Sequence, residues 1–134
     1  MTGARVEAVE PDPEVARRTL DQACSHLRSA RVEGVDAESA YGLAYQAALK
    51  AMVAALLFDG QRVTSGTGGH VVILREAAKR LALDPKLVDR LDHMRRTRHR
   101  VFYDIAEISG LEIEGALADA DTLLEAARHH VGRS

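Results

Sequence analysis

The sequence is poor in cysteine, in aromatic residues and in long apolar runs, and each shortage excludes a class of protein. Cys24 is its one cysteine, so it has neither an internal disulfide framework nor a thiolate zinc cluster. Two phenylalanines, three tyrosines and no tryptophan argue against an aromatic-rich β-sheet. The longest apolar run, residues 47–58, contains Lys50 and is well short of the roughly 20 residues that span a bilayer. The N-terminal residues carry acids and lack the apolar segment of a secretory signal, so we expect a soluble cytoplasmic protein that does not bind membranes.

What the chain has in abundance is alanine. Hydrophobic residues make up 46% of its 134 residues, and much of that content is alanine methyl groups, which suit closely packed helices. The length favours one domain. The formal net charge of −2 argues against a polybasic nucleic-acid binder, although it leaves room for a local basic patch.

Helix-start and helix-stop residues divide the chain into helical segments. Asp12-Pro13-Glu14 and Asp84-Pro85 each combine a capping acid with a proline suited to the first helical turn, and Gly34 and Gly60 are typical of helix ends. Together with the spacing of apolar residues, these signals predict helices at about residues 12–33, 36–59, 70–82, 85–105 and 112–131.

The predicted fold class is all-α: an up-and-down helical bundle of four to five helices, because short connections make successive helices antiparallel neighbours. The second helix is apolar on most faces and is expected at the centre. We expect one helical-bundle domain at residues 12–131, a flexible N-terminal arm at residues 1–11 and a C-terminal tail at residues 132–134. The Gly-rich residues 60–69 are predicted to be a loop, and His70 a helix-start residue.

The fourth predicted helix has an arginine at a position where its apolar pattern predicts a residue such as leucine. Arg98 lies midway between Met94 and Val101 on the predicted seam, whose apolar members are Leu87, Leu91, Met94, Val101 and Ile105. A guanidinium is costly to bury without a partner. Either Arg98 pairs with an internal carboxylate such as Asp119 or Asp121, or the seam opens at this point into a cleft or an interface.

The surroundings of Arg98 are strongly basic. Between Asp92 and Asp104 there are four arginines and two histidines and no acid, whereas residues 104–127 hold seven acids and no lysine or arginine. The acidic last helix is therefore a candidate to neutralise the basic one, within the bundle or across a dimer. Guanidinium groups beside an imidazole and aromatic rings are also typical of phosphate and base recognition. The candidate RNA- or nucleotide-binding residues are Arg95, Arg96, Arg98, His99, Phe102 and Tyr103.

The long Ala-rich second helix, the Gly-rich loop, the short helix led by His70 and the Arg-rich fourth helix resemble the HEPN superfamily, the higher eukaryotes and prokaryotes nucleotide-binding domain. The resemblance covers residues 12–131, and its specific part is Arg98-His99-x3-Tyr103. In this family the corresponding arginine and a histidine form a metal-independent RNase site across a dimer cleft. The resemblance implies that Arg98 contacts the phosphate and that His99 and Tyr103 complete a catalytic set.

This chain departs from the family pattern because its motif is R-x4-Y in place of R-x4-H. A phenol with a pKa of about 10 is a poor general base at neutral pH, whereas an imidazole with a pKa of about 6.5 is well suited to that role. The fold therefore carries over from the family more readily than the nuclease activity.

The resemblance implies a homodimer that binds RNA, a nucleotide or a partner protein without efficient catalysis. Its setting would be a bacterial toxin–antitoxin or defence system, with a nucleotidyltransferase-type partner. Two alternatives remain open: a metal-independent endoribonuclease toxin and a purely structural bundle in which Arg98 is paired internally. No metal site and no cofactor are predicted, because the histidines lack the spacing of a metal-binding helix.

Overall fold

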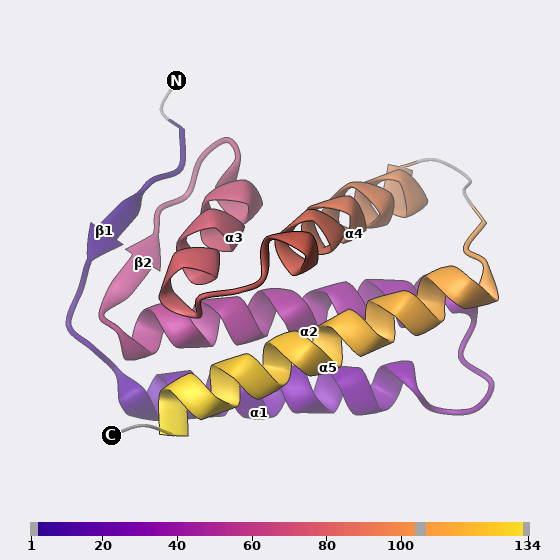
Figure 1. Ribbon diagram of the computed structural model, residues 1–134, viewed down its shortest axis with the longest axis horizontal. Helices are drawn as coiled ribbons and strands as arrows, with labels where there is room; N and C mark the ends of the chain where they lie inside the picture. Colours follow the sequence, from indigo (N-terminus) through magenta and orange to yellow (C-terminus); the bar gives the residue numbers. More distant parts are fainter. Residues whose placement is uncertain (1–2, 104–106, 133–134) are drawn as a thin grey trace.

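The computed structural model describes residues 3–103 and 107–132, which form five helices and two short strands (Figure 1). In chain order these are β1 (Val6–Ala8), α1 (Pro13–Ala30), α2 (Ala37–Phe58), β2 (Gln61–Val63), α3 (Gly69–Arg80), α4 (Pro85–Tyr103) and α5 (Gly110–Gly132). The all-α helical bundle predicted from the sequence is confirmed.

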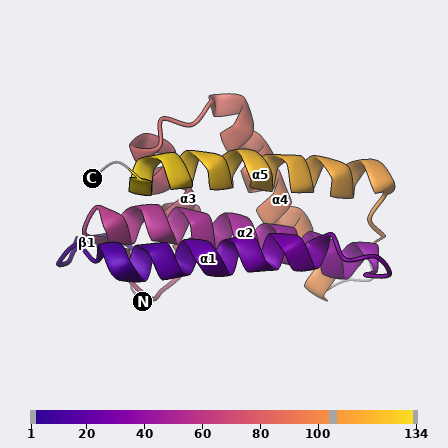
Figure 2. The same ribbon diagram turned by 90° about the horizontal axis from the view of Figure 1, so that it is seen from below.

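Helix α2 is the centre of the bundle. It contacts each of the other four helices. Helices α1, α2 and α5 run side by side, whereas α3 and α4 lie on the remaining side of α2 (Figures 1 and 2). Because both α3 and α4 contact α2, residues that are distant in the sequence can come together where the three helices meet.

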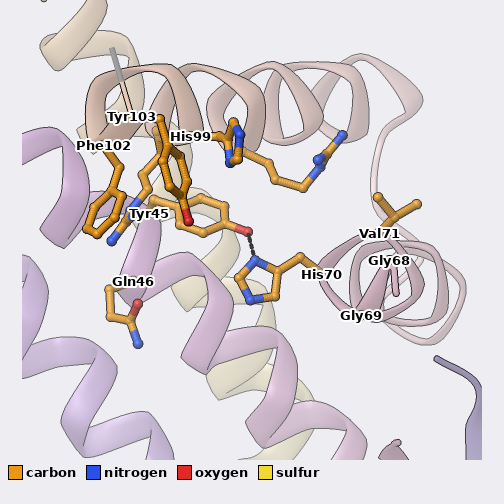
Figure 3. Close-up of a pocket in the computed structure, with 11 residues that line it drawn as sticks. Tyr45, Gln46, Gly68, Gly69, His70, Val71, His99, Phe102 and Tyr103 are labelled. Carbon is orange, nitrogen blue, oxygen red and sulfur yellow. Dashed lines mark hydrogen bonds between the residues drawn. The ribbon is translucent and has the colours of Figure 1, made fainter. Parts of the chain in front are cut away.

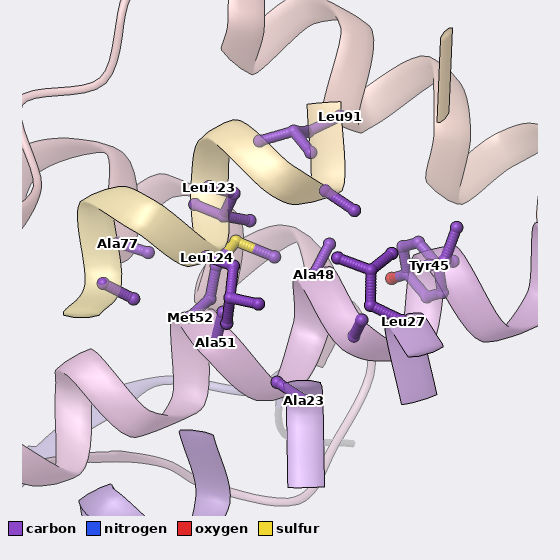
Figure 4. Packing of buried hydrophobic residues seen from close by; sticks show 14 of the residues in the cluster. Ala23, Leu27, Tyr45, Ala48, Ala51, Met52, Ala77, Leu91, Leu123 and Leu124 are labelled. Atoms are coloured by element: carbon purple, nitrogen blue, oxygen red, sulfur yellow. The ribbon is translucent and has the colours of Figure 1, made fainter. Parts of the chain in front are cut away.

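Alanine allows α2 to be contacted on several sides at once. Ala44, Ala51, Ala54 and Ala55 are fully buried, and their small side chains let neighbouring helices approach closely. Larger core residues such as Met52 and Leu123 fill the spaces between them (Figure 4). By length and composition alone α2 is apolar enough to cross a membrane. Its position among four packed helices accounts for that composition in the described structure.

The predicted capping residues start the first two helices. The Asp12 carboxylate accepts a hydrogen bond from the Val15 amide with Pro13 at the start of α1, and the Asp36 carboxylate accepts one from the Ser39 amide. Helix α1 ends at Ala30, earlier than the predicted boundary near residue 33, because the Arg31 amide already turns back to Arg28 and Ser29. The predicted extension of α4 to Ile105 and the residues of the C-terminal tail at 133–134 lie outside the described residues.

The expectation of a flexible arm at residues 1–11 and of a loop throughout residues 60–69 needs correction. Strand β1 pairs with β2 in antiparallel register, with Val6 opposite Val63 and Ala8 opposite Gln61. Three-residue strands are too short to show an alternating pattern in a sequence. Their pairing also joins segments more than 50 residues apart, which local signals do not report.

Gly60 links this small sheet to the end of α2, and we expect Gly60→Ala to destabilise the protein by about 2–3 kcal/mol. Its φ of +73° is left-handed, and an added Cβ would lie 2.8 Å from the Val9 carbonyl oxygen and 2.9 Å from Pro11 Cγ. Chemical denaturation measures the loss. Gly34→Ala is the matched control, since Gly34 has a φ of +94° but nothing within 4 Å of an added Cβ. Equal losses in the two variants would contradict the close approach at Gly60.

Candidate functional site

The buried face of α4 follows the predicted seam for two turns and then leaves it. Leu87, Leu91 and Met94 are buried as expected, but the next buried residue is Thr97, which is 1% exposed, rather than Arg98. Arg98 and Val101 are only partly buried. Ideal helical spacing places Arg98 on the same face as Met94 and Val101. At this point of α4, however, that face is only partly covered by neighbouring helices. The seam opens into a cleft, which is one of the two alternatives that the sequence left open.

Arg98 has no internal carboxylate partner among residues 3–103 and 107–132. Asp119 pairs with Arg90, with an Nε–Oδ1 distance of 3.1 Å, and Asp121 pairs with Arg31 of α1. The interpretation of Asp119 or Asp121 as the partner of Arg98 is therefore wrong. The Arg98 guanidinium instead lies over the Phe102 ring, with its Cζ atom 4.9 Å from the ring centroid.

The cleft beside Arg98 has a volume of about 460 Å³ and is formed by three helices (Figure 3). Its lining residues are Tyr45 and Gln46 of α2, Gly68, Gly69, His70 and Val71 at the start of α3, and Arg95, Arg98, His99, Phe102 and Tyr103 of α4. Within the described part of the chain, these lining residues include two arginines and two histidines but no acid. The cleft is therefore electropositive.

His70 reaches into the cleft from the opposite side to α4. Its Nδ1 atom forms a 2.8 Å hydrogen bond with the Tyr45 hydroxyl, and Figure 3 shows the two side chains pointing toward each other. Burial raises the pKa of Tyr45 to about 12, so its hydroxyl stays protonated and can donate. Burial, and then the charges of Arg95 and Arg98, lower the pKa of His70, so the imidazole is neutral at physiological pH.

The structure brings most, but not all, of the sequence-predicted site residues together. Arg95, Arg98, His99, Phe102 and Tyr103 line the cleft. Arg96 does not: its side chain is exposed and pairs with Asp92, with an Nε–Oδ2 distance of 3.3 Å. Arg95 also pairs with Asp92, at 3.0 Å, but remains at the cleft wall. One carboxylate of the same helix thus partly neutralises two of the arginines.

Within the bundle, α5 does not neutralise the basic stretch among the described residues. Arg90–Asp119 is the one ion pair between α4 and α5 in this part of the chain, and it lies before the basic stretch. Arg100 contacts the Thr97 hydroxyl at 3.4 Å. The positive charge of Arg98 and its neighbours is therefore left to face the cleft and solvent.

Aromatic rings form the end of the cleft nearest the C-terminus of α4. The ring centroids of His99 and Tyr103 are 4.5 Å apart, and those of Phe102 and Tyr103 are 4.9 Å apart. Phe102 and Tyr103 are 65% and 69% exposed, which is unusual for large apolar residues. Exposed rings beside guanidinium groups provide surfaces on which nucleobases can stack.

Two contributors to the cleft, Tyr45 and His70, were missed by the sequence analysis. His70 lies at the start of α3, as predicted, and Tyr45 is a buried residue of α2. Their contact depends on how α3 packs against α2, for which the sequence holds no direct signal.

As for metals, no group of three or more His, Cys, Asp or Glu side chains suited to an ion occurs in residues 3–103 and 107–132.

Comparison with known proteins supports the resemblance noted in the sequence. The family profile described as "HEPN domain" matches residues 14–130, which covers nearly the whole chain. A search of curated proteins gave no match.

Proposed function

The chain belongs to the HEPN domain family, and from this premise we propose that it binds single-stranded RNA in the cleft between α2, α3 and α4. The family is one of nucleotide- and RNA-binding or RNase-like helical proteins. The observation that carries the proposal is the acid-free lining of the cleft, in which Arg98 is half-buried and has no carboxylate partner among the described residues.

The phosphate and the base of a nucleotide each have complementary groups in the cleft. The guanidinium groups of Arg95 and Arg98 can donate charge-assisted hydrogen bonds to phosphate oxygens. The exposed rings of Phe102 and Tyr103 offer stacking surfaces for one or two bases. A volume of about 460 Å³ lies within the range typical of small-ligand sites, so the cleft is large enough for one nucleotide of a longer strand.

We expect Arg98→Ala to weaken binding of a fluorescently labelled single-stranded RNA by roughly tenfold to a hundredfold at low salt, as measured by fluorescence anisotropy. The reason is the loss of a charge-assisted hydrogen bond to phosphate, which contributes about 1.5–3 kcal/mol. Affinity of the unaltered protein should fall linearly with salt on a double-logarithmic plot.

Arg18→Ala is the matched control for this experiment. Arg18 is an exposed residue of α1, a helix that does not contact α3 or α4 appreciably, and its replacement changes the net charge by the same amount. Equal weakening in Arg18→Ala and Arg98→Ala would show that binding depends on net charge and not on the cleft.

RNA cleavage is less well supported than RNA binding. The position at which the family motif has its histidine is Tyr103, whose side chain is largely exposed and whose phenol is a poor base at neutral pH. We therefore propose that the RNA is released from the complex at full length, which gel electrophoresis after incubation can check.

The proposal extends to the setting of the protein. The exposed Phe102 and Tyr103 at the edge of the cleft are suited to contact a second copy of the chain or a nucleotidyltransferase-type partner. A cytoplasmic homodimer acting in a bacterial toxin–antitoxin or defence system fits these features. The alternative, a metal-independent endoribonuclease toxin, predicts that expression of the protein halts growth and that Arg98→Ala relieves the arrest; under the binding proposal the two cultures grow alike.

A further inference from the structure

His70 and the two cleft arginines approach the same space from different helices. His70 lies in the first turn of α3, and Arg95 and Arg98 lie on α4. The Tyr45 hydroxyl holds Nδ1 of His70 at 2.8 Å, which leaves Nε2 without a hydrogen-bond partner among residues 3–103 and 107–132. This arrangement fixes the imidazole while keeping one of its nitrogen atoms available to a ligand.

The groups that line the cleft around His70 are positive or neutral, and Asp92 of α4, which pairs with Arg95 at 3.0 Å, lies outside that lining. Those that titrate or carry charge are Tyr45 on α2 and Arg95, Arg98, His99 and Tyr103 on α4. No acid is among the described lining residues of the cleft, and the charges that disfavour an imidazolium at His70 in the empty site are those of Arg95 and Arg98. A bound anion would change this, because it would offset the two guanidinium charges and attract a proton to His70.

We propose that His70 makes the cleft selective for a terminal phosphate group, a phosphomonoester with two negative charges, over the phosphodiester within a strand. The proposal rests on the RNA-binding function above and specifies which part of the RNA enters the cleft. An internal phosphodiester has one charge and two free oxygens, which one guanidinium fork can satisfy. A terminal phosphate has three free oxygens and a charge of about −1.5 to −2 at neutral pH, so it can accept hydrogen bonds from Arg95, Arg98 and His70 together.

Proton uptake accompanies this binding. While the Tyr45 hydroxyl donates to Nδ1, the neutral ring carries its proton on Nε2, so the added proton goes to Nδ1 and the Tyr45 hydroxyl then accepts from it. In the empty cleft the pKa of His70 is lowered by burial and by the charges of Arg95 and Arg98. A bound dianion offsets those charges, so the pKa of His70 is higher in the complex than in the free protein. By linkage, affinity for the terminal phosphate rises as the pH falls from the pKa in the complex toward the pKa in the free protein.

The test uses one single-stranded RNA sequence with a 5′-phosphate, with a 3′-phosphate, and with hydroxyl groups at both ends. We expect the unaltered protein to bind one phosphorylated form about tenfold more tightly than the hydroxyl form at about pH 6.5, with a smaller preference at about pH 8. A nucleoside monophosphate used as competitor distinguishes a free nucleotide from an RNA end as the preferred source of the phosphate.

His70→Gln removes the titrating group, and we expect it to lose most of the preference for a phosphorylated form and its dependence on pH, while Arg95 and Arg98 still bind the RNA. Tyr45→Phe keeps the imidazole but removes its support, so the preference should be reduced and not abolished. Circular dichroism confirms that both variants fold. The inference is overturned if the unaltered protein binds the three forms equally, or if His70→Gln keeps the preference. In either case, loss of hydroxyl-form binding in Arg98→Ala would still support RNA binding, whereas failure of every RNA to bind would overturn both.

Discussion

Replacing Arg95 and Arg98 together by alanine is expected to weaken binding of single-stranded RNA by roughly two to three orders of magnitude at low salt. Both guanidinium groups line the cleft. Arg98 has no carboxylate partner among the described residues, and Arg95 shares the Asp92 carboxylate with Arg96. Each arginine that neutralises a phosphate of a single strand adds about 0.7 to the slope of log affinity against log salt. The slope of the double variant should therefore be smaller by about 1.4.

The control for the double variant is Arg17→Ala with Arg18→Ala, two adjacent exposed arginines of α1. It removes the same charge at a distance from the cleft. Asp92 keeps Arg96 as an ion-pair partner when Arg95 is replaced, so the fold of α4 should not depend on the lost pair. If the α1 double variant loses as much affinity and as much salt dependence, the cleft is not the binding site.

Leu123→Ala is expected to lower the free energy of unfolding by about 2–5 kcal/mol, a large part of the stability of a domain of this size. Leu123 of α5 is fully buried and packs in the cluster formed with Met52 and the alanines of α2 (Figure 4). Removing its side chain leaves a cavity that the short alanine side chains around it cannot fill. Urea denaturation, followed by circular dichroism, measures the loss.

Leu111→Ala is the matched control for the core. It removes the same atoms from the same helix, but Leu111 is 81% exposed, so stability should change by no more than about 0.5 kcal/mol. A similar loss in both variants would contradict the packing of α5 against α2. A small loss in Leu123→Ala alone would show that this part of the core can collapse around the cavity.

The helices could be predicted because their signals are local. Asp12 and Asp36 start α1 and α2 through their own carboxylates, as the sequence indicated. The alanine content of α2 likewise identified the central helix. The pairing of β1 with β2 could not be predicted, since it joins two three-residue segments from distant parts of the chain and depends on where α2 ends.

Only one wall of the candidate site, the one formed by α4, could be predicted from the sequence. The basic and aromatic residues of α4 share a helix face, so their spacing indicated a common surface. His70 and Tyr45 come from α3 and α2, and only the packing of three helices brings them to that surface. The same packing explains why Thr97 and not Arg98 is buried: helical spacing defines a face, but the neighbouring helices decide how far it is covered.

Mapping the contact in solution shows whether RNA binds in the cleft between α2, α3 and α4. Backbone amide chemical shifts of the isotope-labelled protein would be followed during titration with a single-stranded RNA. We expect the largest changes at residues 68–71 and 95–103, which border the cleft, and small changes on α1 and the exposed face of α5. Changes concentrated on α1 or α5, with the residues of the cleft unaffected, would show that RNA binds elsewhere.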